Sequence, residues 1–207
     1  MADSKLAVPE LGAVEVHGLT RSAFIVKGAL SAGAVYGAAT VGPFVSQALA
    51  QGGGDVDVLN FALTLEYLEA DFYEKGLSLK LSGDVTKLAK QFGDSEQQHV
   101  DALTQTIEKL GGTPTAKPTF VFPIKDEKGF LKLAQTLEDT GVSAYNGAAP
   151  QIESKEVLGA AGSIVQVEAR HAAAIRLLAS QPPAPAAFDE SLDKPAVLKA
   201  VKPLIKA

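Results

Sequence analysis

One pattern of glutamate, tyrosine and histidine occurs twice in this chain, and the two copies are 72 residues apart. In each copy a glutamate is followed after seven residues by a tyrosine and after thirty residues by a Glu-x-x-His pair. The first copy consists of Glu66, Tyr73, Glu96 and His99, and the second of Glu138, Tyr145, Glu168 and His171. The chain has three histidines, and the remaining one, His17, precedes both copies. Both histidines downstream of it therefore belong to a Glu-x-x-His pair.

The spacing inside each pair determines what the pair can bind, because residues three apart share one face of a helix. Glu96 and His99 can therefore reach one metal ion, and the pair formed by Glu168 and His171 can reach another. A single glutamate from each of two helices plus a Glu-x-x-His pair from each of two others is the known ligand pattern of two-metal carboxylate sites. We therefore expect two divalent ions inside a four-helix bundle, with Glu66 and Glu138 bridging or flanking them.

The charge of this ligand set fits two divalent cations. Four inward carboxylates carry four negative charges, which two divalent cations cancel, whereas without metal they need strongly raised pKa values or destabilise the core. Mixed glutamate and histidine ligands favour iron or manganese. The alternative is a helical bundle without tight metal binding, because a single Glu-x-x-His on a helix is usually a solvated turn.

Three residues lie close to the six candidate ligands. Tyr73 and Tyr145 fall on the inward stripes of their helices, where each hydroxyl can hydrogen-bond a ligand carboxylate. They can equally be ordinary core tyrosines. Glu69 also lies near the inward face, but its counterpart in the second copy is Gly141. We therefore expect Glu69 at the rim of the bundle or in solvent.

Apolar residues recur with helical periodicity in four segments, which predicts helices over about 55–80, 84–110, 126–148 and 153–180. The inward stripe of the first helix ends at Leu77. Residues 111–125 contain three prolines and are too long for a tight helix hairpin, but they suit a crossover along a bundle. The predicted fold class is an all-α four-helix bundle with one long crossover between its second and third helices.

Both ends of the chain differ from this bundle region. Residues 1–50 have the layout of a signal peptide that ends in Ala48-Leu49-Ala50, and residues 51–54 form a glycine linker. The signal is similar to a twin-arginine signal, but Ser22 stands in place of the second arginine. Cleavage would give a periplasmic, cell-surface or secreted protein, whereas an uncleaved leader would be a membrane anchor.

The C-terminal residues 181–207 begin with a proline-rich stretch and end in a short amphipathic segment. We expect this segment to dock on the bundle, and a partner-binding tail is the alternative. The net charge of −5 and the lack of a basic run exclude nucleic acid as a partner. The chain has no cysteine, which excludes disulfides and cysteine-bound iron–sulfur clusters.

The run Asn60-Phe61-Ala62-Leu63-Thr64-Leu65-Glu66-Tyr67-Leu68-Glu69 and the two Glu-x-x-His pairs resemble the ferritin-like superfamily. The resemblance covers about residues 55–180 and is to the exported bacterial ferritin-like domain proteins of the desiccation-related type. It implies that Glu66 and Glu138 are the single-glutamate ligands, and that the paired ligands are Glu96, His99, Glu168 and His171.

The resemblance also implies activities, since many members of the superfamily activate dioxygen or peroxide at two iron or manganese ions. The leading hypothesis is therefore oxidation of Fe(II) or reduction of dioxygen or peroxide outside the cytoplasm. A non-catalytic stress-protective or structural bundle is the second hypothesis. Metal storage is the third, and it requires a closed shell of many subunits. The sequence assigns no catalytic residue beyond the ligands and leaves a homo-oligomer open.

Overall fold

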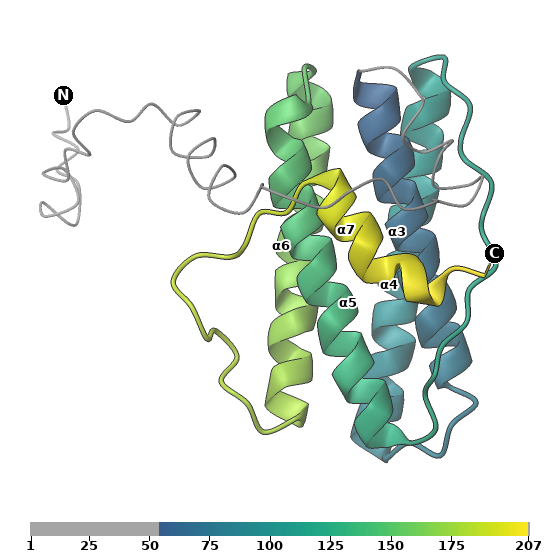
Figure 1. Ribbon diagram of the computed structural model, residues 1–207, viewed down its shortest axis with the longest axis vertical. Coiled ribbons are helices and arrows are strands. Elements are labelled where there is room, and N and C mark those ends of the chain that lie inside the picture. The colour runs from purple at the N-terminus through teal and green to yellow at the C-terminus, as the bar shows by residue number, and fades with distance from the viewer. Residues whose placement is uncertain (1–53, 207) are drawn as a thin grey trace, which may run out of the picture. The chain divides into compact units, whose positions relative to one another are not determined.

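The computed structural model describes residues 54–206, and they form an all-α fold. The four long helices are α3 (Asp55–Gly76), α4 (Gly83–Lys109), α5 (Glu127–Ala148) and α6 (Lys155–Leu178), followed by the short α7 (Lys194–Val201) (Figure 1). The predicted fold class, an all-α helical bundle, is confirmed. The predicted signal peptide and residues 51–53 of the predicted linker lie outside the described residues.

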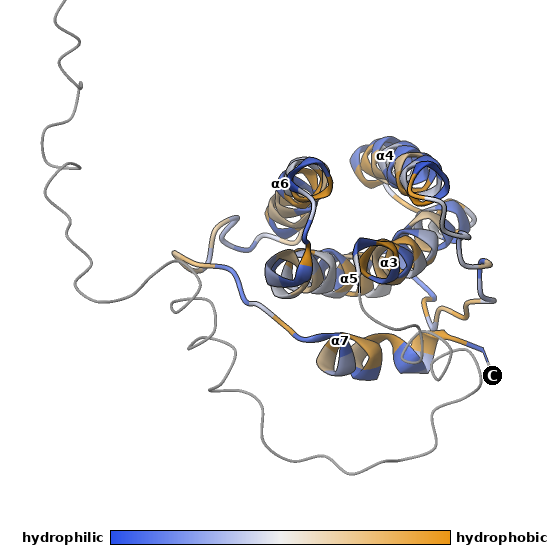
Figure 2. Ribbon diagram, turned by 90° about the horizontal axis from the view of Figure 1, so that it is seen from above, coloured by the Kyte–Doolittle hydropathy of each residue, from blue (hydrophilic) through white to orange (hydrophobic). Residues whose placement is uncertain are grey.

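The four long helices pack in pairs. Helix α3 lies against α4, α5 lies against α6, and contacts between α3 and α5 and between α4 and α6 close the bundle (Figure 2). The carboxylate of Asp55 at the start of α3 accepts hydrogen bonds from the backbone N–H groups of Glu153 (2.7 Å) and Ser154 (2.9 Å). These bonds hold the beginnings of α3 and α6 together.

The segment between α4 and α5 runs along the length of the bundle (Figure 1). Two polar residues of α3 hold it in place. The amide of Asn60 accepts a hydrogen bond from the backbone N–H of Thr115 at 2.7 Å, and Asp71 forms an ion pair with Lys117 at 2.8 Å. Burial would raise the pKa of Asp71, but the hydrogen bond from Lys117 and its positive charge help to lower it. Because the chain returns along the bundle, α5 begins beside the end of α3 and runs antiparallel to it.

Helix α3 ends at Gly76 rather than near Lys80. The Cα of Gly76 packs against the ring of Phe130 on α5, and the hydroxyl of Ser78 hydrogen-bonds the carbonyl of Lys75 at 2.7 Å. A hydroxyl bound to a local carbonyl offers the backbone an alternative to the helix. Leu77 is consequently 38% exposed, and its predicted place on the inward stripe is wrong.

The hydrophobic core consists of two clusters. One is rich in aromatic side chains and includes Phe72, Phe92, Phe130 and Ile175. The other includes Leu59, Leu63, Ile107 and Ile164. On each helix, the glutamates of the repeated pattern fall between residues of the first cluster and residues of the second. The bundle therefore encloses a polar layer between two apolar ones.

Helix α7 packs against α5 (Figure 2). It buries Val197, Leu198 and Val201. Beyond it, Ile205 forms an isolated antiparallel bridge with Phe120 of the crossover. The structure thus places the C-terminal amphipathic segment on the bundle surface. No helix between residues 54 and 206 is both long enough and apolar enough to cross a membrane.

Candidate metal centre

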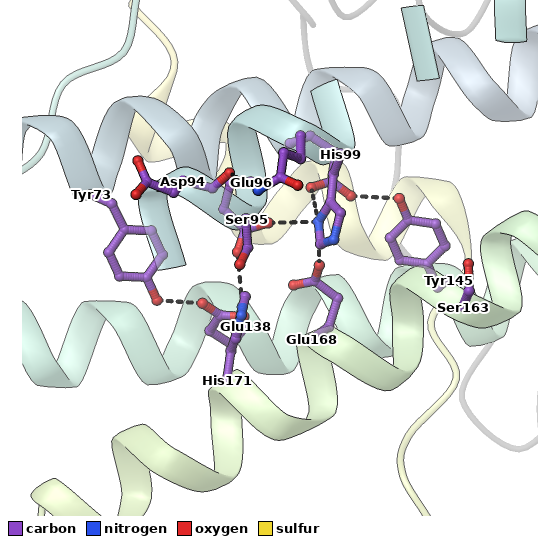
Figure 3. Close-up of polar contacts among 12 residues, drawn as sticks. Tyr73, Asp94, Ser95, Glu96, His99, Glu138, Tyr145, Ser163, Glu168 and His171 are labelled. Atoms are coloured by element: carbon purple, nitrogen blue, oxygen red, sulfur yellow. Dashed lines mark hydrogen bonds and ion pairs between the residues drawn. The ribbon is translucent and has the colours of Figure 1, made fainter. Parts of the chain in front are cut away.

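The polar layer brings together all six predicted ligand side chains. Figure 3 labels five of them: Glu96, His99, Glu138, Glu168 and His171. Each long helix contributes: α3 provides Glu66, α4 provides Glu96 and His99, α5 provides Glu138, and α6 provides Glu168 and His171. All four carboxylate residues are fully buried, with 0% exposure. The two imidazoles are nearly as enclosed, with side chains 12% exposed at His99 and 5% exposed at His171.

Three carboxylates surround the imidazole of His99. Its Nδ1 lies 2.9 Å from Oε2 of Glu96, 3.1 Å from Oε1 of Glu168 and 3.2 Å from Oε2 of Glu66. One ligand atom from each of these four residues lies within 4.8 Å of the others. A single ion can therefore be held by atoms of all four side chains.

The second group of ligand atoms is centred on His171. Its Nδ1 lies 2.8 Å from Oε1 of Glu96 and 3.4 Å from Oε2 of Glu138, and Glu168 completes the group within 4.8 Å. The ring of Phe92 stacks on the imidazole at a centroid distance of 3.8 Å and an angle of 21°. This stacking fixes the orientation of the His171 ring.

Glu96 and Glu168 belong to both groups, whereas Glu66 and Glu138 belong to one group each. The two paired glutamates therefore lie where a carboxylate can bridge two ions. The single glutamates lie on the outer sides of the two ion positions. Of the alternatives that the sequence left open for Glu66 and Glu138, the geometry favours flanking.

Each single glutamate accepts a hydrogen bond from a tyrosine of the antiparallel helix. The hydroxyl of Tyr145 donates to Oε1 of Glu66 at 2.5 Å, and the hydroxyl of Tyr73 donates to Oε1 of Glu138 (Figure 3). Tyr73 packs closely against α4: a Cβ added at Gly93 on α4 would lie 3.1 Å from the Cβ of Tyr73. Both tyrosines thus contact a carboxylate of the cluster in addition to packing in the core.

The expectation that Glu69 lies at the rim or in solvent is wrong, because the residue is only 3% exposed. A Cβ added at Gly141 on α5 would lie 3.2 Å from Oε1 of Glu69. The glycine therefore leaves the space that the Glu69 carboxylate occupies. Sequence reasoning missed this residue, although two signals were present: Glu69 follows Glu66 by one helical turn, and the repeat pairs it with a glycine.

Burial raises the pKa values of Glu66, Glu138 and Glu168 well above their usual range. Repulsion between carboxylates adds to this effect: the charge of Glu168 raises the pKa of Glu66, and the charge of Glu96 raises the pKa of Glu138. The pKa of Glu69 is also raised well above its usual range, by burial first and then by the charge of Glu168. Without metal, these carboxyl groups therefore retain protons far above the pH at which an exposed glutamate loses its own.

Glu96 and His99 behave in the opposite way. Burial would raise the pKa of Glu96, but the close approach of the imidazoles of His171 and His99 lowers it to about 2. Burial would lower the pKa of His99, but the surrounding carboxylates of Glu168, Glu66 and Glu96 raise it to about 12. In the metal-free protein, a protonated imidazole thus lies among carboxylates, in the position of a cation.

Several buried atoms of the cluster lack a partner in hydrogen-bond geometry among the described residues. They are Oε1 of Glu96, Oε2 of Glu138, both carboxylate oxygens of Glu168, and Nδ1 of His171. Some of them lie within ion-pair distance of each other or of His99, but without hydrogen-bond geometry. A buried polar atom without a hydrogen bond is costly, and several facing one centre are explained when an ion binds them. Carboxylate oxygens and imidazole nitrogens are donors that iron and manganese accept. The residues present therefore fit a pair of such ions.

Comparison with known proteins agrees with the helical fold. The ferritin-like domain family matches residues 54–181. A conserved hypothetical protein from Mycobacterium tuberculosis has a similar structure, with a TM-score of 0.57 and 18% identity, over 70% of this chain and 99% of that one. A ferritin-like, diiron-carboxylate protein from Bacillus anthracis str. Ames gives a TM-score of 0.55 and 22% identity, over 67% of this chain and 99% of that one.

At these identities the two structures show a shared fold alone. No curated protein matches the chain. The family match covers most of the sequence, from the start of α3 to just beyond α6. The chain belongs to the ferritin-like domain family.

Proposed function

We propose that this protein holds two iron or manganese ions in its buried glutamate and histidine layer and uses them as an oxidoreductase. The reaction is oxidation of Fe(II), or reduction of dioxygen or peroxide with electrons from the bound metal. The observation that carries this proposal is the pair of four-residue ligand groups that share Glu96 and Glu168. Shared carboxylates place two ions close together, which is the arrangement used by two-metal sites.

The ligand assignment follows the two groups. Glu66 and His99 would hold one ion, Glu138 and His171 the other, and the two shared carboxylates both. Two divalent ions balance the four negative charges of Glu66, Glu96, Glu138 and Glu168. Bound iron or manganese would supply the electrons that dioxygen or peroxide accepts.

The protein contributes orientation and exclusion of water. The hydroxyls of Tyr73 and Tyr145 hold the Glu138 and Glu66 carboxylates, which leaves the other oxygen of each free to face the centre. The ring of Phe92 holds the His171 imidazole. The apolar clusters on both sides keep bulk water away, which strengthens electrostatic interactions inside the layer.

A non-catalytic, stress-protective bundle is the second candidate. The contacts of His99 with three carboxylates favour it, because a protonated imidazole there holds the layer together without metal. In that case, metal would only add stability to a fold that already exists.

Anaerobic titration with Fe(II), followed by exposure to oxygen, separates these two candidates. The matched variants are E96Q, which removes a shared carboxylate, and E108Q, which alters an exposed glutamate on the same helix. Two Fe(II) ions per chain and a rapid rise in ferric absorption in wild type and E108Q, both lost in E96Q, support the oxidoreductase. Binding without oxidation faster than that of free Fe(II) supports the structural bundle.

We also propose that the protein acts after export, as the desiccation-related members of its superfamily do. The signal-like layout of residues 1–50 supports this proposal. The intact mass of protein isolated from its native host should correspond to a chain beginning near Gln51. A mass that includes residues 1–50, found in the membrane fraction, would instead support an uncleaved anchor.

A further inference from the structure

Glu69 is a fifth buried carboxylate in the polar layer, outside the two ligand groups described above. It lies on α3 one turn after Glu66 and is 3% exposed. The charges that act on it most strongly are those of other carboxylates, with Glu168 first and Glu138 next. A buried carboxylate among like charges is costly unless a cation compensates it. The environment of Glu69 therefore requires an explanation.

The position of Glu69 relative to α5 explains its buried environment. A Cβ added at Gly141 would lie 3.2 Å from Oε1 of Glu69 and 3.4 Å from Oε2 of Glu168. The carboxylates of Glu69 and Glu168 thus meet over the same glycine. Oε2 of Glu168, the oxygen nearest this point, has no hydrogen-bond partner among the described residues, whereas Oε1 contacts His99.

The repeat explains why a glycine is needed at this point. Residues 69 and 141 are 72 positions apart, the same offset as Glu66 and Glu138 or Tyr73 and Tyr145. Two equivalent positions that face each other lie on either side of the approximate two-fold axis relating the two halves of the bundle. The Glu69 carboxylate occupies the space beside this axis, because its Oε1 lies 3.2 Å from where a Cβ of residue 141 would be. The chain has a carboxylate in one copy and no side chain in the other.

We propose that Glu69 is a seventh side-chain ligand of the metal centre, placed beside the approximate two-fold axis where its carboxylate can reach either ion or both. This inference rests on the proposed two-metal function. A fifth carboxylate brings the charge of the ligands to −5, which leaves one negative charge that two divalent ions do not neutralise. The centre therefore favours an ion pair with at least one trivalent member, and removing Glu69 should raise the reduction potential of bound iron.

Titration with Mn(II), followed by the electron paramagnetic resonance signal of the free ion, tests this assignment. E69Q keeps the shape of the side chain and removes the charge. G141A keeps Glu69, but its methyl group would lie 3.2 Å from Oε1 and displace the carboxylate. E74Q, at an exposed glutamate on the same helix, is the control. We expect E69Q and G141A to bind Mn(II) about tenfold or more weakly than wild type, and E74Q to match wild type.

A crystal structure of the Mn(II)-loaded wild-type protein gives an independent readout, which holds even when E69Q does not fold. The inference predicts a Glu69 oxygen within about 2.5 Å of an ion, the range of metal–carboxylate bonds. Mn(II) affinity in E69Q and G141A equal to that of E74Q, or a Glu69 carboxylate turned away from both ions, overturns the seventh-ligand assignment alone. Failure of wild type to bind any Mn(II) overturns the two-metal function together with it.

Discussion

The hydroxyl of Tyr145 on α5 lies 2.5 Å from Oε1 of Glu66 on α3, and Tyr73 on α3 makes the reciprocal contact with Glu138 on α5. The two contacts are equivalent: the half formed by α3 and α4 and the half formed by α5 and α6 each provide one tyrosine and one glutamate. Each outer carboxylate is thus oriented by a residue of the opposite half. The two ion positions should therefore depend on each other through α3 and α5, and not only through the shared glutamates.

Replacing Tyr145 by phenylalanine should weaken metal binding while leaving the fold intact. The ring still packs, but the buried Glu66 carboxylate loses its donor and its fixed orientation. Loss of such a supporting hydrogen bond typically lowers metal affinity about 10–100-fold. Calorimetric titration with Mn(II) measures the effect, and Y67F, a partly buried tyrosine on α3, is the control. Equal affinities in Y145F and Y67F would show that the hydroxyl contact is incidental.

Replacing His99 by alanine should mainly impair binding of the ion beside Glu66, and replacing His171 by alanine should mainly impair binding of the ion beside Glu138. Each substitution removes the only nitrogen donor of its ligand group. We expect a fall in affinity of about tenfold or more at that position, with Q105A on the exposed face of α4 as control. H171A should also lower the melting temperature of the metal-free protein, because Phe92 loses its stacking partner. Unchanged stoichiometry and affinity in both variants would remove the histidines from the ligand set.

Metal binding should release protons. In the metal-free protein the raised pKa values of Glu66, Glu138 and Glu168 keep protons on these groups, and His99, with a pKa of about 12, is protonated. Ligands must lose their protons before they bind a cation, so metal affinity should rise with pH. Titration calorimetry in buffers with different ionisation enthalpies counts the released protons. A binding enthalpy that does not depend on the buffer would contradict this prediction.

The metal-free protein should become less stable as the pH rises. Glu66, Glu69, Glu138 and Glu168 have folded pKa values raised above the unfolded value of 4.5, so their stabilising protonation is complete below that value and is lost as the pH rises through the folded pKa. The raised pKa of His99 acts in the same direction above 6.5. Within the polar layer, Glu96 acts in the opposite direction, because its lowered pKa adds stability that is lost at low pH, between 4.5 and about 2.

Thermal melts of metal-free protein at pH 5 and pH 8, with and without Mn(II), measure this dependence. We expect a lower melting temperature at pH 8 than at pH 5 without metal. Added Mn(II) should restore stability at pH 8 by mass action, since it binds the folded state. Identical melting temperatures under all four conditions would mean that the glutamates and histidines are solvated.

The sequence predicts the four helices and the cluster of six side chains because the same helical periodicity places the apolar residues and the six ligands on the inward faces. A glutamate three residues before a histidine faces the same way as the leucines that surround it, so a prediction of the inward face includes the polar residues on it. The end of α3 could not be predicted in this way. It depends on Phe130 packing against Gly76, a contact between residues that belong to different helices.

The burial of Glu69 and the roles of the glutamates also depend on tertiary structure. Whether Glu69 points to solvent or inward is decided by the space beside Gly141, which local periodicity does not describe. Likewise, the spacing places Glu66 and Glu96 in one site, but only the relative positions of four helices determine that Glu96 is shared and Glu66 is not.

The central claim, that this layer binds two metal ions, is tested most directly by anomalous diffraction from crystals of the Mn(II)-loaded protein. We expect two peaks inside the bundle, both contacting Glu96 and Glu168. One peak should also contact Glu66 and His99, and the other Glu138 and His171. Absence of anomalous signal from this layer at saturating Mn(II), with ions found only on the protein surface, would contradict the account.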